Sequence, residues 1–260
     1  MKRILTFLLG LSFGLALMAQ PKVVGHRGCR YEGPFENTLA AMKIAQNAGV
    51  DAIEFDINLT ADGEVIVFHG PLVPGMEKDI RDMTFAEARK VVLPGGHRMP
   101  TMQEWFRQAR KHPEIRLVIE IKKQYDREKE TELVRKTIEI VREEGMAPFV
   151  EYTAFGEYIC DEVRRLDPKA KIIYLHKGTS IKNAAWAKEK GYDGISYDLN
   201  GFLNHPEIAA QAKELGVETT LWLVNDFEVA SWAILHGIDY ISTDFPEKLV
   251  PYIDAVKNYR

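Results

Sequence analysis

Val23-Val24-Gly25-His26-Arg27-Gly28 is the first of four short apolar stretches that end in ionisable residues. Two more follow within fifty residues, Ala52-Ile53-Glu54-Phe55-Asp56 and Val67-Phe68-His69, and the fourth is Leu117-Val118-Ile119-Glu120-Ile121-Lys122. A buried strand can carry such groups only at its end, where the chain leaves the core. Four strands that end in this way predict one shared site at one edge of a parallel sheet.

A recurring unit supports the parallel sheet. A helical pattern ends at a glycine, a turn residue follows, and a short apolar strand begins; the four copies start at Ala48-Gly49, Lys190-Gly191, Leu215-Gly216 and His236-Gly237. Glycine directly after a helix adopts the left-handed cap conformation. The strands that follow are nearly continuous apolar runs, which are typical of strands buried on both faces and therefore parallel.

The whole chain divides into eight such units. We expect strands near 22–27, 51–58, 116–122, 149–154, 171–176, 194–198, 219–224 and 240–243. We expect helices near 37–48, 101–112, 128–144, 157–166, 181–190, 205–215, 226–236 and 246–257. Eight βα units in about 240 residues match an α/β fold of the closed (β/α)₈ or TIM-barrel type. An open doubly wound sheet is the alternative, but no Gly-x-Gly-x-x-Gly turn follows the first strand.

Two additions to the barrel are predicted after the second strand. Residues 64–69 are an extra strand that returns along the second strand and forms a short β-hairpin across the Ala61-Asp62-Gly63 turn. Residues 70–100 are rich in proline and glycine, so we expect a loop-rich segment over the barrel mouth.

The first nineteen residues are predicted to be a signal peptide. Met1-Lys2-Arg3 is a positive start, Ile4 to Met18 is apolar, and Ala19 is a small residue at the end of this region. Residues 20–260 then form a single catalytic barrel domain that is secreted or periplasmic. An uncleaved membrane anchor is the alternative, although the apolar run is short and interrupted by glycine.

Composition excludes several classes of protein. The chain is 46% hydrophobic and 28% charged, as expected of a folded domain. Loss of the signal peptide removes Lys2 and Arg3, so the formal net charge changes from −4 to −6, which does not suit a nucleic-acid binder. Cys29 and Cys160 follow strands on opposite sides of the predicted ring, so we expect two free thiols and no metal site between them.

Three carboxylates are candidate metal ligands. Glu54 and Asp56 lie two residues apart on one strand, so their side chains leave the same face, and Glu120 ends the next barrel strand. Close carboxylates repel one another unless a cation or a proton lies between them. A set of oxygen ligands without cysteine suits one divalent cation, Mg²⁺ or Ca²⁺. The alternative is that these acids form structural ion pairs with Arg27 and Lys122.

Two histidines and two cations end strands at the same rim. His26 and His69 suit general acid–base catalysis, in which one activates the nucleophile and the other protonates the leaving oxygen. Arg27 and Lys122 beside a bound cation suit the oxygens of a phosphate group.

Other polar and aromatic residues have plainer interpretations. Asn37 and Thr38 are expected to cap the first helix, and Asp244 is expected to cap or pair rather than react. Trp222 on the seventh barrel strand either fills the barrel or forms a wall for the organic part of a substrate.

These motifs together resemble the glycerophosphodiester phosphodiesterase family. The resemblance covers nearly all of the chain after the predicted signal, in order. Its motifs are Gly25-His26-Arg27-Gly28, Glu36-Asn37-Thr38, Glu54-x-Asp56, Val67-x-His69, Ile119-Glu120-Ile121-Lys122, Met99 to Glu104, Trp222-x-Val224-Asn225 and Ser242-Thr243-Asp244-x-Pro246.

The resemblance implies a phosphodiesterase on a TIM barrel that hydrolyses glycerophosphodiesters to sn-glycerol 3-phosphate and an alcohol. It implies a divalent cation on Glu54, Asp56 and Glu120, and catalysis by His26 and His69. It implies that Arg27 and Lys122 hold the phosphate. In the family mechanism the adjacent glycerol hydroxyl attacks phosphorus, and water then opens the cyclic phosphate.

Three departures from the family pattern lie near the site. Gly70 replaces the aspartate that usually follows the second histidine, and Pro71-Leu72-Val73-Pro74-Gly75 replaces a Leu-x-Arg-Thr-Thr stretch. Phe35 stands where the family has proline. The first two changes lie beside His69, where they bear on substrate preference.

Two other functions are compatible with such a barrel. One is a lysophospholipase D-like or sphingomyelinase D-like phosphodiesterase, which needs an apolar groove for acyl chains. The other is a non-catalytic phosphodiester-binding protein, which the intact histidines and carboxylates disfavour. No nucleic-acid partner and no stable membrane insertion after signal cleavage are expected, and the sequence leaves the oligomeric state open.

Overall fold

The computed structural model describes residues 20–30 and 35–258. The predicted signal peptide therefore lies outside the described residues. Within them, no helix has both the length and the apolar character that a membrane span requires.

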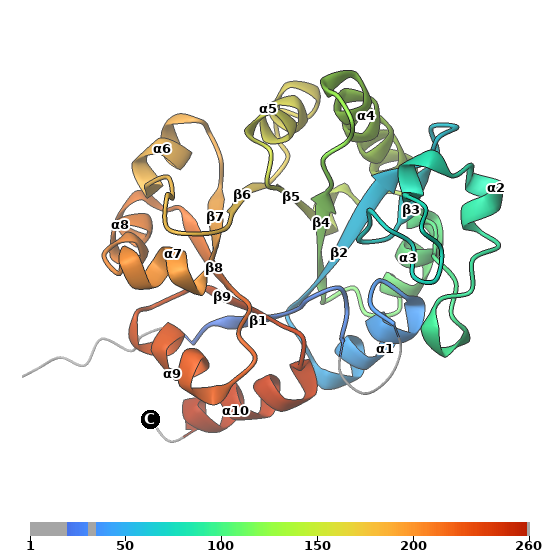
Figure 1. Ribbon diagram of the computed structural model, residues 1–260. Helices are drawn as coiled ribbons and strands as arrows, with labels where there is room; N and C mark the ends of the chain where they lie inside the picture. The colour runs from blue at the N-terminus through green and yellow to red at the C-terminus, as the bar shows by residue number, and fades with distance from the viewer. Residues whose placement is uncertain (1–19, 31–34, 259–260) are drawn as a thin grey trace, which may run out of the picture.

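Eight parallel strands form a closed ring (Figure 1). They are β1 (Lys22–Gly25), β2 (Ala52–Leu59), β4 (Arg116–Ile121), β5 (Val150–Ala154), β6 (Ile172–His176), β7 (Gly194–Asp198), β8 (Glu218–Trp222) and β9 (Tyr240–Thr243). Each pairs in parallel with its neighbours around the ring, and β1 pairs with both β9 and β2. The β1–β2 pairing closes the sheet, which confirms the TIM barrel and rules out the open doubly wound alternative.

Helices surround the ring on its outer side (Figure 1). They are α1 (Leu39–Ala48), α3 (Met102–Ala109), α4 (Arg127–Glu143), α5 (Glu157–Leu166), α6 (Ala184–Glu189), α7 (Leu199–Asn204), α8 (Ile208–Leu215), α9 (Phe227–Leu235) and α10 (Pro246–Asn258). A single-turn 3₁₀ helix, η3 (Ala147–Phe149), precedes β5. The left-handed caps predicted at Gly49 and Gly216 are present, with φ of 77° and 66°.

The helix α7 was not predicted from the sequence. It is only six residues long and begins directly after β7, where the Asp198 carboxylate accepts a hydrogen bond from the backbone N–H of Gly201. A helix this short carries too few turns to show an apolar period, so the pattern did not reveal it.

The predicted hairpin after the second barrel strand is present but shorter than expected. β3 (Val65–Val67) pairs antiparallel with β2, with Val67 opposite Ile57. Phe68 leaves the strand pairing, yet its backbone N–H still donates to the carbonyl of Asp56 at 3.0 Å. This bond holds the start of the following segment against the end of β2, which is where the predicted site lies.

Residues 70–100 form a small unit on the β2 side of the barrel, around the 3₁₀ helices η1 (Ile80–Asp82) and η2 (Pro94–Gly96) and the helix α2 (Phe85–Ala88) (Figure 1). This unit has its own apolar cluster, separate from the main core. Its buried members are Ile66, Phe68, Val73, Ile80, Met83, Ala88, Val91, Leu93 and Met99. The segment is therefore loop-rich but packed, and it can shape one wall of the mouth.

The main core lies between the strands and the outer helices. Its largest cluster near the site surrounds Phe55, which stacks on Trp105 with ring centroids 4.7 Å apart and meets Phe106 edge-on. Because Phe55 points outward into this core, its neighbours Glu54 and Asp56 point to the inner face of the ring. Cys29 and Cys160 are both buried, and no disulfide joins them to each other, as expected.

Candidate active site

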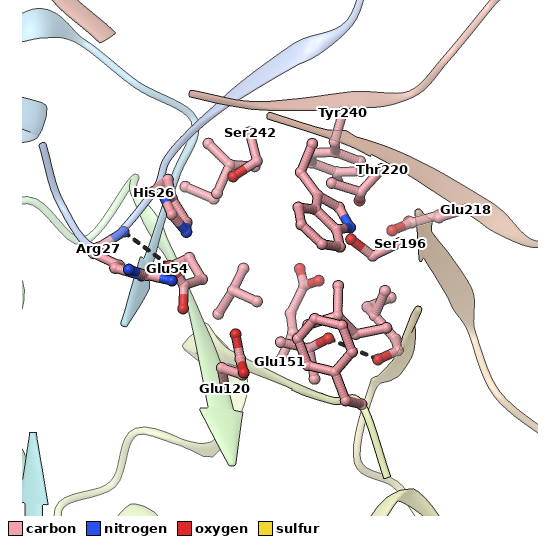
Figure 2. A pocket seen from close by; sticks show the side chains of 18 of the residues that line it. His26, Arg27, Glu54, Glu120, Glu151, Ser196, Glu218, Thr220, Tyr240 and Ser242 are labelled. Carbon is pink, nitrogen blue, oxygen red and sulfur yellow. Dashed lines mark hydrogen bonds between the residues drawn. The ribbon is translucent and has the colours of Figure 1, made fainter. Parts of the chain in front are cut away.

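The three predicted metal ligands lie together at the carboxyl end of the barrel. Asp56 of β2 is in register with Glu120 of β4, and Glu54 is two residues before Asp56. One oxygen from each carboxylate lies within 4.8 Å of the others. All three side chains are buried, and Figure 2 shows Glu54 and Glu120 on the same side of the cavity.

Burial and mutual repulsion perturb these acids strongly. Burial raises the pKa of Glu54 well above its usual range, and the charges of Asp56 and Glu120 raise it further. Burial and the charge of Asp56 raise the pKa of Glu120 to about 7. For Asp56, the cations Lys122 and Arg27 outweigh burial and hold the pKa below its usual range. The three carboxyls thus need a proton or a cation between them to offset their repulsion.

Both predicted phosphate-binding cations contact this cluster. Lys122 Nζ lies 2.6 Å from Glu120 Oε1 and 3.1 Å from Asp56 Oδ1, and Arg27 Nε lies 3.2 Å from Asp56 Oδ2. The ion pairs that we considered as an alternative to metal binding are therefore present. These pairs leave one carboxylate without a cation of its own, because three acids face two cations. Arg27 also donates hydrogen bonds to Glu36.

Glu54 is the carboxylate that the ion pairs leave incompletely satisfied. Its Oε2 accepts the backbone N–H of Arg27 at 2.8 Å, but its Oε1 is buried with no hydrogen-bond partner among the described residues. A buried carboxylate oxygen without a partner is costly. A bound divalent cation would satisfy it, so the donor set fits Mg²⁺ or Ca²⁺.

The turn after β1 places Arg27 over Glu54. Arg27 has φ of 52° and Gly28 has φ of 82°, so two consecutive residues adopt the left-handed conformation. A side chain at Gly28 would bring a Cβ atom within 2.7 Å of the backbone of Ala41 in α1. Gly28 thus allows the close approach that turns the backbone N–H of Arg27 toward the carboxylate.

His26 is oriented by a carboxylate that directly follows the last strand of the ring. Its Nδ1 lies 2.7 Å from Asp244 Oδ1, just beyond the end of β9. Asn225 holds Asp244 from the other side, donating from Nδ2 to Asp244 Oδ2 at 2.9 Å. Although burial opposes it, the hydrogen bond from His26 lowers the pKa of Asp244. Asp244 therefore pairs rather than reacts, as expected.

His69 lines the same cavity. Burial, together with the nearby charges of Lys122 and Arg27, lowers the pKa of His69 to about 4, although the charge of Asp56 opposes this shift. Its Nδ1 lies 3.9 Å from Glu36 Oε1. At neutral pH the imidazole is thus uncharged and can accept a proton.

Asn37 has a role that differs from the predicted one. The helix α1 begins at Leu39, and Thr38 alone caps it by accepting the backbone N–H of Ala41. Asn37 instead donates from Nδ2 to Asp56 Oδ2 at 2.7 Å and accepts the backbone N–H of Asp56 at 3.0 Å. It has φ of 57°, which asparagine tolerates better than most residues. Asn37 therefore positions a candidate metal ligand.

The predicted site residues share one cavity of about 340 Å³, which begins at the rim and continues into the barrel. Its rim includes His26, Arg27, Glu54, His69, Glu120 and Lys122. Asp56 lies just behind them, fully buried. Trp222 lines the opposite side and meets Phe155 edge-on at 5.8 Å, which is the position predicted for a substrate wall.

The unusual sequence after His69 forms a second, smaller hollow that adjoins the cavity. Pro71 and Arg81 from the 70–100 segment line it together with His69, Lys123 and Phe155. Gly70 has φ of 64°, and a Cβ there would lie 3.2 Å from the side-chain amide of Asn58. The departures from the family pattern therefore shape the wall next to a candidate catalytic histidine.

Comparisons with known proteins identify the family. The model of the glycerophosphoryl diester phosphodiesterase family matches residues 26–248. A glycerophosphodiester phosphodiesterase of Caldanaerobacter subterraneus is 30% identical over 238 residues, which cover 88% of this chain and 96% of the relative.

Solved structures agree with this result. A glycerophosphodiester phosphodiesterase from Parabacteroides distasonis superposes with a TM-score of 0.86 at 29% identity, covering 92% of this chain and 98% of that one. A phosphodiesterase from Oleispira antarctica, solved in complex with the product sn-glycerol-3-phosphate, shares the fold with a TM-score of 0.82 at 20% identity, covering 90% and 97% of the two chains. The chain therefore belongs to the glycerophosphoryl diester phosphodiesterase family and is a phosphoric diester hydrolase.

Proposed function

We propose that the protein hydrolyses glycerophosphodiesters to sn-glycerol 3-phosphate and an alcohol, with one divalent cation, Mg²⁺ or Ca²⁺, held by Glu54, Asp56 and Glu120. The observation that carries the proposal is the unsatisfied, buried Glu54 oxygen in a cluster of three carboxylates that also contacts two cations. The bound cation would stabilise negative charge that develops on the phosphate oxygens. Arg27 and Lys122 would hold the same phosphate by charge and hydrogen bonds.

The two histidines would move the protons. His69 takes the proton from the glycerol hydroxyl next to the phosphate ester, and that oxygen forms a new bond to phosphorus. His26 gives a proton to the oxygen of the departing alcohol as its bond to phosphorus breaks. The hydrogen bond between His26 and Asp244 supports this role, because the carboxylate stabilises the protonated imidazole.

The second half of the reaction would reverse these roles. The first step leaves a cyclic phosphate diester. His26, now neutral, takes a proton from water as the water oxygen bonds to phosphorus, and His69 returns a proton to the glycerol oxygen as the ring opens. Both histidines then have their starting protonation, and the product is sn-glycerol 3-phosphate.

The test is product release by the mature protein. Glycerophosphocholine, glycerophosphoethanolamine and lysophosphatidylcholine are incubated with enzyme in EDTA and then with Mg²⁺ or Ca²⁺ added. Glycerol 3-phosphate from the first two substrates, lost in EDTA and restored by one cation, is the expected result. Turnover of lysophosphatidylcholine alone would instead support a lysophospholipase D-like enzyme, and activity that persists after exhaustive chelation would contradict the cation.

We also propose that the enzyme acts outside the cytoplasm, because residues 1–19 have the composition of a secretory signal. Expression of the full chain in a bacterial host, followed by mass spectrometry of the periplasmic fraction, tests this. A mature protein that starts near Gln20 is expected, and a full-length chain confined to the cytoplasm would contradict the proposal.

A further inference from the structure

Small side chains leave the interior of this barrel open. Bulky branched residues in layers usually fill a TIM barrel. Here Ala52, Ser196, Thr220 and Ser242 line the cavity below the rim, and it reaches down to Glu151 and Glu218 at the start of β5 and β8. The cavity is therefore deep enough to take part of a substrate below the catalytic groups.

Three hydroxyl groups line this cavity. Among the described residues, no side-chain hydrogen bond forms to Ser196, Thr220 or Ser242, although Ser196 and Ser242 are each only 6% exposed. Thr153, which lines the same cavity, differs because its hydroxyl donates to the carbonyl of Ile173 at 2.8 Å. The Trp222 indole Nε1 is buried and has no hydrogen-bond partner among the described residues. The three hydroxyls differ from it because they face the open cavity, where a hydroxyl-bearing ligand can pair with them.

The hydroxyls lie at a suitable depth below the site of reaction. Ser242 is in register with Val24, two residues before His26, so it lies about 6.6 Å below His26 along the strands. Ser196 and Thr220 are in register with each other on neighbouring strands. Figure 2 shows them across the cavity from Glu54 and Glu120. A three-carbon chain attached to a phosphate at the rim spans this depth.

Ion pairs close the cavity below these hydroxyls. Glu151 pairs with Arg116 at 2.5 Å and with Lys171 at 3.3 Å, and Lys171 also pairs with Glu218 at 2.6 Å. A closed end limits the interior to a small group of constant size. The alcohol half of the substrate varies and must leave, so it belongs at the open mouth.

We propose that Ser196, Thr220 and Ser242 bind the terminal hydroxyl of the glycerol half of the substrate and so contribute to the choice of substrate. This inference rests on the proposed function. A site built to hydrogen-bond a substrate hydroxyl discriminates against an analogue that lacks it, because its own polar groups are then left unpaired.

The experiment compares two substrates. One is glycerophosphocholine, and the other is the phosphocholine diester of propane-1,2-diol, which keeps the attacking hydroxyl and lacks only the terminal one. The wild type is expected to show a kcat/KM at least about tenfold higher for the glycerol diester. In the S196A/T220V/S242A variant, this ratio should fall to near one. The single variants Ser196→Ala and Ser242→Ala should each lower it by about two- to fivefold.

The matched control is Thr153→Val, which removes a cavity-lining hydroxyl that already has a partner. It should keep the wild-type ratio, and because the ratio cancels the fraction of active enzyme, it is insensitive to a loss of folded protein. Equal turnover of both substrates by the wild type would overturn the inference. An unchanged ratio in the triple variant and in both single variants would also overturn it, because the hydroxyls would then bind only water. If the cation-loaded wild type hydrolyses neither substrate, the proposed function fails, and this inference fails with it.

Discussion

The two ends of the barrel carry the same kinds of charged residue in a different balance. At the amino end of the strands, Glu151 and Glu218 face Arg116 and Lys171, so each carboxylate has a cation. At the carboxyl end, three carboxylates face two cations, and among the described residues the Glu54 oxygen Oε1 has neither a hydrogen-bond partner nor an ion pair. The two ends thus differ in the balance of charge rather than in the presence of charged groups. An excess of carboxylates can be offset by a proton or by a further cation.

Histidine substitutions at the two ends of the barrel should differ most in their effect on activity. His26→Ala and His69→Ala should each lower kcat by about 10² to 10⁴-fold, because each removes a proton-transfer group. His112→Ala is the matched control, since His112 lies before β4 near the amino end and is paired with Glu114 on the surface. Circular dichroism should show all three variants folded. Near-normal turnover by either His26→Ala or His69→Ala would refute its assigned role.

A smaller loss of activity is expected from the residue that orients His26. Asp244→Asn should lower kcat by about ten- to hundredfold, because the amide cannot stabilise a protonated His26 as the carboxylate does. KM should change little. An unchanged KM and an unchanged melting temperature separate this role from a structural one. A loss of kcat that is matched by a loss of folded protein would leave only a structural role for Asp244.

At the amino end, the expected effect is on stability rather than on activity. Glu151→Gln leaves Lys171 and Arg116 short of a partner and should lower the free energy of unfolding by about 1–3 kcal/mol, less than a fully buried pair because Arg116 is partly exposed. Urea unfolding measures this cost. kcat at a temperature where the variant is folded should stay near the wild-type value, and a large loss of kcat with unchanged stability would contradict the comparison.

At the carboxyl end, a glutamate-to-glutamine substitution should instead stabilise the cation-free protein. In EDTA, Glu54→Gln should raise the melting temperature by about 2–4 °C, because it removes a carboxyl whose ionisation is opposed by burial and by the charges of Asp56 and Glu120. The folded pKa of Glu54 is raised, so the wild-type carboxyl destabilises the cation-free fold increasingly as pH rises above the unfolded value. The gain should thus grow between pH 5 and 8. Added Mg²⁺ or Ca²⁺ should reverse the order by stabilising only the wild type, and a variant that melts below the wild type in EDTA would contradict the repulsion.

Much of the fold and of the site follows from local pattern. A strand buried on both faces can hold charges only at its end, so the runs that lead to His26, Glu54 and Glu120 predicted both the parallel barrel and the residues that share its mouth. The short helix α7 escaped this reasoning because one and a half turns show no period.

Contacts that form only in the folded protein were harder to predict from the sequence. Asn37 precedes a helix and has the composition of a cap, yet its bonds go to Asp56 on the neighbouring strand. Whether Ser196 or Thr153 has a free hydroxyl depends on side-chain orientation within the barrel, and the two residues look alike in sequence. These contacts depend on how neighbouring strands are aligned and on which rotamer each side chain adopts.

The hydrogen bond between His26 and Asp244 joins two residues that are 218 positions apart, directly after the first and last strands of the ring. A chain that is still being synthesised, or that is threading through a translocation channel, lacks this contact until Asp244 has emerged. Neither closure of the barrel nor orientation of the histidine can precede that moment. Hydrolysis thus requires a closed barrel. A chain that stops before β9 is expected to be inactive toward diesters in the compartment in which it is made.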